Sequence, residues 1–452
     1  MESYGERIPT SNILIYSSPV LGVFMASMLV GFYLLKFSTD VLLIAPATIG
    51  TLLLVARIWD AVTDPAAGWL SDRTNTRLGR RRPWFLGSAL PLGCSIVMLW
   101  SPPESLEGGY LTAWVGCSII LFYTAYTAFR VPHIAMGAEL SRGYHDRTRV
   151  FGIMQATESF GMFAAAGVLV FLENAENPRE FARLLSIGMG IFAAALIIIA
   201  ALNIRERADF QGRGGESPWR SFRDVLVNPH ARILIVVFFL EQLGFSALVA
   251  LVPYLSDYVL ETPGSTGLYL FGAIGATLVS IPAWVFLSKR FGKKSVWLVS
   301  LSLKAALFGV MFFLAGGGFA TMVAVSVGFG LLNGCGAVVG PSLKADVVDW
   351  DEGETGERKE GSYFAAWNFV QKGAGGIAIW VIGVTLSMTG FVPNVTQSEE
   401  TIFGIMLIAS IAPCLLHVLA LFMMMRFSLS EEEHRNAMQR AANGEFTRGD
   451  AS

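Results

Sequence analysis

The stretch LLLVARIWDAVTDPAAGWLSDRTNTRLGRRRPW, residues 52–84, begins as an apolar run and carries charged residues at its centre. In an α-helix, Arg57, Asp60 and Asp64 stand at i, i+3 and i+7, so they lie along one stripe of one face. Charged side chains inside a membrane-spanning helix are costly and usually face the interior of a bundle. If this run crosses a membrane, its charged stripe is expected to point away from lipid.

The rest of the chain places this run in a membrane protein. Of the 452 residues, 53% are hydrophobic and only 15% are charged, whereas soluble domains carry about a quarter charged residues. Apolar runs recur along the chain, each long enough to cross a bilayer core as a helix. The sequence predicts an all-α polytopic protein with twelve transmembrane helices, at residues 13–38, 43–70, 84–101, 110–139, 148–172, 182–204, 231–259, 266–288, 294–316, 319–348, 360–390 and 401–427.

Several functional classes are disfavoured by composition and motifs. The net charge of −2 leaves no basic footprint for nucleic acid. The four cysteines fall within predicted helices without metal or disulfide spacing. No HExxH, GxSxG or paired His–Asp pattern points to an enzyme, so neither catalysis nor a cofactor is expected. An intramembrane enzyme and a receptor stay distant alternatives, and no appended signalling domain supports the latter.

Basic residues define the predicted topology. Lys and Arg gather after predicted helices 2, 4 and 8 and in the polar segment 205–230, whereas the loops 101–110, 256–267, 314–320 and 390–400 have none. Only Arg179 and Arg183 depart from this pattern. The positive-inside rule therefore predicts cytoplasmic termini, in the inner (plasma) membrane. The predicted domains are a six-helix bundle at 1–204, a cytoplasmic linker at 205–230, a second bundle at 231–427 and a cytoplasmic tail at 428–452.

The tail contains a helix-start pattern. Ser430 and Glu433 have the spacing of a capping box. The sequence therefore predicts a short helix in the cytoplasmic tail.

A repeat relates the two halves. RLGRRRPW at 77–84 and RFGKKSVW at 290–297 align with a shift of 213 residues, and both follow the second helix of their half. Repeated halves are typical of transporters that work by alternating access. We therefore expect two pseudo-symmetric bundles.

The basic loops also supply candidate gate residues. Asp72 and the arginines after it can form a cytoplasmic latch, or they can act only as topology signals, and both interpretations remain open. In the second half, Lys344 is expected to form a gate ion pair with Asp346. The candidate gate residues are Gly68, Asp72, Arg73, Gly79, Arg80, Arg81, Lys344 and Asp346.

Two motifs resemble a known family. The stretch at 52–84 and ADVVDWDEGETGERKEGSYFAAWNFVQKGAGG at 345–376 are similar to segments of the glycoside–pentoside–hexuronide:cation symporter family of the major facilitator superfamily. The resemblance implies the superfamily fold, cation-coupled sugar transport, and a solute pocket between two bundles. It also implies that Asp60 and Asp64 form the coupling-ion site, preceded by Arg57 and accompanied by Lys372.

The chain departs from the sugar-binding pattern of that family at three positions. Phe24 and Arg130 stand where sugar-binding members have an aspartate, and Gln155 stands where they have an arginine. Arg130 has two interpretations. Its planar guanidinium suits a carboxylate, sulfonate or phosphate group of a solute, or it replaces a bound cation by pairing with Asp60 or Asp64.

Further polar and aromatic residues are candidates for the solute site. His133 is either a proton relay or a histidine held by a backbone group. Glu158 and Glu241 are either protonation sites or interhelical hydrogen-bond partners, and Lys304 is expected to extend toward the interface. The candidate solute-binding residues are Phe24, Tyr126, Arg130, His133, Gln155, Glu158, Trp367, Asn368 and Gln371.

Two like carboxylates one turn apart, Asp60 and Asp64, cannot both ionise freely, so they share a proton or a cation or are neutralised by nearby basic groups. A purely structural ion network is the alternative. The sequence thus predicts a monomeric H⁺- or Na⁺-coupled symporter in a lipid bilayer, with no metal site beyond a possible Na⁺ at this pair. Its solute is expected to be a small glycoside, uronide or other anionic compound, and a lysolipid or similar amphipath is the alternative.

Overall fold

The computed structural model describes residues 8–140, 144–204, 206, 225–314, 316–357 and 359–443. In these ranges the regular secondary structure is helical, and eleven helices are long and apolar enough to cross a membrane. A further helix, α2 (Pro46–Arg73), is also long, with 28 residues, but it carries Arg57, Asp60 and Asp64 in its middle. The all-α polytopic class is confirmed, and α2 falls outside the eleven apolar helices.

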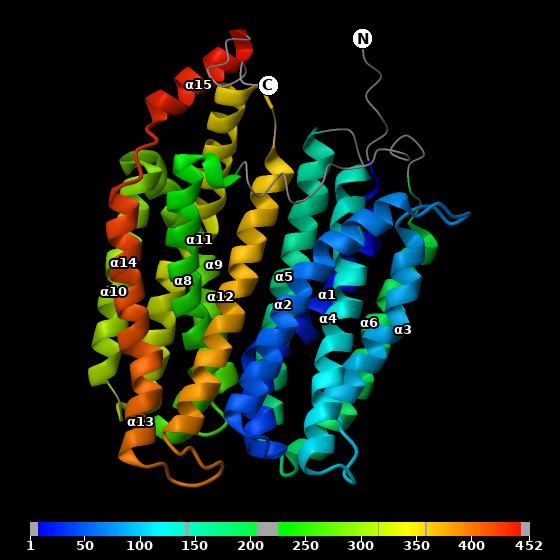
Figure 1. The fold of residues 1–452 in the computed structure, drawn as a ribbon, viewed down its shortest axis with the longest axis vertical. Helices are drawn as coiled ribbons and strands as arrows, with labels where there is room; N and C mark the ends of the chain where they lie inside the picture. Colours follow the sequence, from blue (N-terminus) through cyan, green and yellow to red (C-terminus); the bar gives the residue numbers. More distant parts are fainter. Residues whose placement is uncertain are drawn as a thin grey trace. The chain divides into compact units, whose positions relative to one another are not determined.

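The described chain divides into two compact units (Figure 1). Unit 1 contains the first six long helices, in which α3 packs on α4 and α6, α1 packs on α5 and α6, and α2 packs on α4. Its helices are α1 (Thr10–Lys36), continued by the π-helical turn η1 (Phe37–Val41), α2, α3 (Arg82–Trp100), α4 (Gly108–Glu139), α5 (Tyr144–Glu173) and α6 (Pro178–Asn203).

Glycines permit the closest approach in unit 1, between α3 and α6. A Cβ atom on Gly93 would lie 2.8 Å from the carbonyl oxygen of Gly190, and one on Gly190 would lie 2.6 Å from that of Gly93. Small residues of this kind let membrane helices pack backbone against backbone.

Unit 2 contains the remaining helices, in which α8 packs on α12 and α14, and α10 packs on α11 and α14. In Figure 1 its helices run from green to red. They are α8 (Pro229–Tyr254), continued by the π-helical turn η3 (Leu255–Val259), α9 (Thr266–Phe291), α10 (Lys293–Phe313), α11 (Gly318–Thr355), α12 (Glu360–Met388), α13 (Glu399–Met406), the π-helical turn η4 (Leu407–Ile411), α14 (Ala412–Met425) and α15 (Glu431–Asn443).

The two units repeat the same local geometry, beyond the similarity of their sequences. After η1 the chain turns at Leu43 with φ of 56°, and after η3 it turns at Glu261 with φ of 52°, positions related by a shift of 218 residues. Non-glycine residues rarely adopt this conformation. Its recurrence after the first long helix of each unit is therefore unlike a chance match. Gly79 and Gly292, from the repeated basic motif, also share a positive φ, at 107° and 83°. These repeats support the pseudo-symmetry of the two bundles.

The tail helix α15 packs on an extension of α11. The predicted tenth helix stops at residue 348, whereas α11 continues to Thr355. The extension is held by α15, since Arg440 pairs with Glu354 at 2.5 Å and a Cβ atom on Gly353 would lie 2.5 Å from the carbonyl oxygen of Ala437.

The capping box that the sequence predicted at the start of α15 is present. The N–H of Glu433 donates to Ser430 Oγ at 3.1 Å, and the N–H of Ser430 donates to Glu433 Oε2 at 2.9 Å.

The predicted linker and tail lie only in part within the described residues. Positions 205 and 207–224 of the linker and 444–452 of the tail fall outside them. At the other end of the linker, α8 begins at Pro229, so residues 229 and 230 are part of that helix.

Candidate functional site

Two carboxylates of α2 share one hydroxyl group of α4. Thr127 Oγ1 lies 2.7 Å from Asp60 Oδ1 and 2.8 Å from Asp64 Oδ1. The Asp60 side chain is fully buried, at 0% exposed, whereas Asp64 is partly exposed. The i, i+4 spacing thus places both acids against the same point of α4, as expected for one stripe of one face.

Hydrogen-bond counting constrains the charge of this group. A hydroxyl has one proton to donate, while an ionised carboxylate only accepts. Thr127 can therefore bridge both acids if it donates to one and accepts from a protonated carboxyl of the other, or if a cation lies among the oxygens. The arrangement suits one positive ion shared by Asp60 and Asp64.

Arg57 is close to this pair but does not neutralise it by direct hydrogen bonding. Its Nη1 lies 3.9 Å from Asp60 Oδ2, and its guanidinium carbon lies 4.6 Å from the centre of the Tyr123 ring. On the neighbouring turn, Trp59 Nε1 donates to Thr124 Oγ1 at 2.8 Å, which ties α2 to α4. Thr127 and Thr124 were not identified from the sequence, because helical threonines are common and nothing local distinguishes these two.

Arg130 pairs with a residue other than the two considered from the sequence. Its Nη2 donates to Glu158 Oε1 on α5, rather than to Asp60 or Asp64. Glu158 is 8% exposed, so its charge is largely removed from solvent and needs this partner. Two candidate solute-binding residues thus satisfy each other in the described structure.

His133 is enclosed inside unit 1. Its Nε2 lies 2.8 Å from the carbonyl oxygen of Tyr16, and the Tyr16 ring stacks on the imidazole at 4.2 Å between centroids. The Tyr16 hydroxyl donates to the carbonyl oxygen of His133 at 2.7 Å. This is the backbone-held arrangement that was one of the two interpretations of His133.

The remaining candidates of unit 1 differ in exposure. Phe24 is partly buried on α1, and Gln155 is exposed on α5. Tyr126 stacks on Phe122 with centroids 6.1 Å apart. Among the described residues, none of these three side chains forms a hydrogen bond or ion pair with Asp60 or Asp64.

The candidates of unit 2 for the ion and solute sites all lie on α12. Trp367 is buried, Asn368 and Gln371 are exposed, and Lys372 is partly exposed. Asp60 and Asp64 belong to unit 1, so the expected association of Lys372 with them stays a prediction.

The basic motif that follows α2 in unit 1 forms a charged network across α2, α3 and α4. Arg81 Nη2 lies 2.5 Å from Asp72 Oδ1, and Arg81 Nη1 donates to Ser71 Oγ at 2.7 Å. Arg80 and Arg81 share Glu139, at 2.7 and 3.1 Å from its Oε1. The arginines are therefore held in defined ion pairs, and their action as a gate stays a prediction.

Two other residues of this motif have packing roles. Arg73 lies over the Trp69 ring, with its guanidinium carbon 3.9 Å from the centroid. Gly68 faces Val131, and a Cβ atom on it would lie 3.6 Å from Val131 Cγ1.

Glu206 caps the start of α3. Its carboxylate accepts from the backbone N–H groups of Arg80, Arg81 and Arg82, at 2.7, 2.7 and 2.8 Å. The first N–H groups of a helix lack partners within it, and the helix dipole favours a negative charge there. Gly79 leaves room for this carboxylate, since a Cβ atom on it would lie 2.6 Å from Glu206 Oε1.

The expected ion pair between Lys344 and Asp346 is wrong. Asp346 pairs with Lys293 of α10, at 2.8 and 2.6 Å. Lys344 instead lies over the Phe238 ring, 3.7 Å from its centroid. The reason is helical geometry, because residues two apart on a helix point to different faces.

Lys304 is also placed differently from the expectation. It is 4% exposed and pairs with Glu241 at 2.5 Å, rather than extending to the interface. The other oxygen of Glu241 accepts from Trp297 Nε1 at 3.2 Å. Glu241 is therefore an interhelical hydrogen-bond partner in a buried ion pair, one of the two interpretations considered for it.

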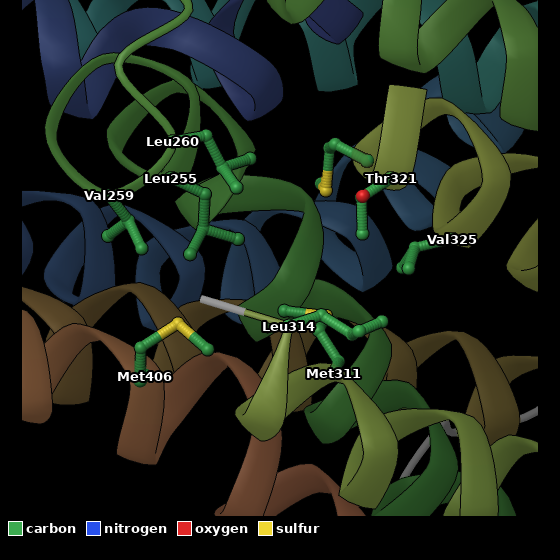
Figure 2. Close-up of a pocket in the computed structure, with 9 residues that line it drawn as sticks. Leu255, Val259, Leu260, Met311, Leu314, Thr321, Val325 and Met406 are labelled. Carbon is green, nitrogen blue, oxygen red and sulfur yellow. The ribbon is translucent and has the colours of Figure 1, made fainter. Parts of the chain in front are cut away.

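A small apolar pocket lies apart from these charged groups, within unit 2 (Figure 2). Its volume is about 20 Å³, close to the space of a single water molecule. Thr321 supplies the only hydroxyl among its lining residues, which are Leu255, Val259, Leu260, Met311, Leu314, Thr321, Met322, Val325 and Met406. This pocket is too small for a sugar and lacks charged groups for an ion.

Comparison with known proteins agrees with this architecture. The chain is 27% identical to the isoprimeverose transporter of Lactiplantibacillus pentosus over 88% of this chain and 84% of that one. It is 26% identical to the sodium-dependent lysophosphatidylcholine symporter 1-A of Danio rerio, over 89% and 82%. The fold is similar to the crystal structure of a D-xylose-proton symporter, with a TM-score of 0.70, 13% identity and coverage of 94% and 99%. Residues 15–431 match the MFS/sugar transport protein family, and the chain belongs to this family of transporters.

Proposed function

We propose that this transporter is a cation-coupled symporter of a small organic solute, working by alternating access. The observation that carries the proposal is the Asp60–Thr127–Asp64 group, in which two acids share one hydroxyl at 2.7 and 2.8 Å. Binding or losing one positive ion changes the charge of this group, and any difference in ion affinity between two conformations shifts their populations.

The coupling ion is H⁺ or Na⁺. A proton requires only the carboxyl–hydroxyl–carboxylate bridge. A Na⁺ ion prefers several oxygen ligands, as hard cations do, and here it would take the carboxylates of Asp60 and Asp64 with Thr127 Oγ1. Pro65 has no N–H group, so the carbonyl of Ala61 one turn earlier loses its helical donor and becomes a further candidate oxygen.

The proposed solute is a small glycoside, uronide or other anionic compound. Similarity to a sugar transporter supports a glycoside. Similarity to a lysophosphatidylcholine symporter, at nearly the same identity and coverage, supports a lysolipid as the second candidate. Both candidate solutes have a polar part, and only the lysolipid has an acyl chain attached to it.

We propose that the protein lies in the inner (plasma) membrane with both termini in the cytoplasm. The basic residues of the loops support this orientation. The proposed units of function are the bundles at 1–204 and 231–427, with a cytoplasmic linker and tail. The transporter is proposed to act as a monomer.

Uptake into proteoliposomes tests the coupled transport. The unmodified protein should accumulate a labelled solute only when a sodium or proton gradient is applied. Asp64→Asn should abolish this accumulation, because the amide cannot bind the ion as the carboxyl does, while exchange of solute without a gradient persists. Glu104→Gln, in an exposed loop of the same unit, serves as the matched control and should accumulate solute normally.

Each outcome decides a part of the proposal. Unchanged accumulation by Asp64→Asn would remove Asp64 from the ion site. Solutes offered in pairs, a glycoside or uronide against a lysophosphatidylcholine, separate the two candidate substrates. Varying sodium at constant pH, and pH at constant sodium, separates the two ions.

A further inference from the structure

Lys344 occupies an unusual position in unit 2. Its ammonium lies 3.7 Å from the centre of the Phe238 ring on α8 and 5.3 Å from that of Trp367 on α12. Aromatic faces attract a cation, by about 0.5–2 kcal/mol. They do not neutralise it, and among the described residues no carboxylate forms a salt bridge with Lys344 within 4.0 Å.

The surrounding charges leave an excess of one positive charge. Glu241, one turn after Phe238 on α8, is the acidic group that acts on Lys344 through space. Its two oxygens are already engaged, by Lys304 at 2.5 Å and by Trp297 Nε1 at 3.2 Å. One carboxylate thus serves two lysines, and a partly buried cation without a full counter-charge is costly.

A buried donor lies beside the same cation. Trp367 is 1% exposed, and its Nε1 has no hydrogen-bond acceptor among the described residues. Buried polar atoms are nearly always hydrogen-bonded. Lys344 and Trp367 therefore both have donor capacity that only an acceptor from outside the described chain would satisfy.

Lys344 itself is partly exposed. An ammonium facing acyl chains would be strongly disfavoured, and such residues usually face water-filled routes. Its two aromatic contacts cover part of the ammonium, and the three N–H donors leave at least one direction for a ligand.

We propose that Lys344, with the Phe238 and Trp367 rings around it, forms an anion subsite of unit 2 that binds a carboxylate, sulfonate or phosphate group of the transported solute. This assignment rests on the proposed function and deepens it by naming the residue that selects an anionic solute. An anion here balances the excess positive charge and accepts charge-assisted hydrogen bonds.

The subsite replaces the expected role of Arg130. Arg130 already holds Glu158 as its partner in unit 1, so a solute anion would have to compete with a resident carboxylate. At Lys344 no such competitor forms a salt bridge in the described structure. Anion selectivity should therefore follow Lys344 rather than Arg130.

Binding of matched probes to the full-length protein in lipid nanodiscs tests the subsite, by calorimetry at fixed sodium and pH. Three pairs differ mainly in the anion: methyl β-D-glucuronide and methyl β-D-glucoside, glucose 6-sulfate and glucose, and lysophosphatidic acid and monoacylglycerol. For at least one pair, the unmodified protein should bind the anionic or phosphate-bearing member more tightly. Lys344→Gln should weaken that member by about ten- to a hundredfold, the effect of losing a hydrogen bond to a charged group.

Three further variants separate recognition from folding. Lys344→Arg should keep most of the preference, and Trp367→Phe, which retains the ring but not the N–H, should lower it by a smaller factor. Lys289→Gln, an exposed lysine of the same unit, should leave it unchanged. Equal weakening of both members of a pair by Lys344→Gln would indicate a structural role and overturn the proposal.

Results that refute the anion subsite differ from results that refute the proposed symport. If no probe pair shows a preference, or if Lys344→Gln retains it, the subsite is wrong, whatever the transport assay shows. If gradient-driven uptake fails for every solute, the symporter proposal is wrong, although anion binding at Lys344 can still be measured. The pair that shows the preference distinguishes a water-soluble anion from a lysolipid head group.

Discussion

Replacing Thr127 with valine tests the ion site most directly, because it removes the shared hydroxyl and leaves both acids in place. The hydroxyl lies 2.7 Å from Asp60 Oδ1 and 2.8 Å from Asp64 Oδ1. With no ion bound, its one proton can serve only one carboxylate, whereas a proton or cation on the pair lets the oxygen serve both acids. The hydroxyl therefore favours the ion-bound state by about one hydrogen bond.

The magnitude follows from this count. One hydrogen bond contributes about 0.5–1.5 kcal/mol, and about 1.4 kcal/mol corresponds to a tenfold change in affinity. Thr127→Val should therefore lower the apparent affinity for the coupling cation by up to about tenfold, for H⁺ or for Na⁺. Solute accumulation at a saturating gradient should be less affected than the ion concentration that gives half-maximal uptake.

The assay is initial-rate uptake into proteoliposomes as a function of sodium and, separately, of pH. Thr127→Ser retains the hydroxyl and should behave like the unmodified protein. Thr124→Val makes the same chemical change one turn away, where the hydroxyl accepts from Trp59 rather than serving an acid, and should leave ion dependence unchanged. Identical ion dependence in Thr127→Val and the unmodified protein, or an equal shift in Thr124→Val, would refute the role of this hydroxyl.

Two ion pairs yield further predictions. Lys304→Met leaves the buried Glu241 carboxylate without its cation and should lower the free energy of unfolding by about 3–5 kcal/mol. Adding Glu241→Gln to this variant should restore much of the loss. Thermal melting of the purified variants measures both effects, and an unchanged melting temperature for Lys304→Met would contradict the pairing. Arg130→Gln should lower uptake of anionic and neutral solutes alike, because it leaves Glu158 without its partner. The double variant Arg130→Gln, Glu158→Gln should recover stability. A loss of uptake confined to anionic solutes would instead assign Arg130 to the solute site.

The sequence determined the positions of the long helices and the charged stripe of α2. Both follow from local patterns, since hydropathy over about 20 residues and a 3.6-residue period need no knowledge of the partner helix. The same holds for the capping box of α15, whose two residues lie three apart. The repeated basic motif similarly indicated two related halves before any contact was known.

The tertiary structure decided which charges meet. Lys304 and Glu241 are 63 residues apart, and Arg130 and Glu158 are 28 apart, so their pairing depends on how helices pack and no local pattern reports it. Lys344 and Asp346 are near neighbours in the chain, yet helical rotation directs them to different faces. Thr127 belongs to the same class, since only the approach of α4 to α2 makes an ordinary helical threonine the bridge between two acids.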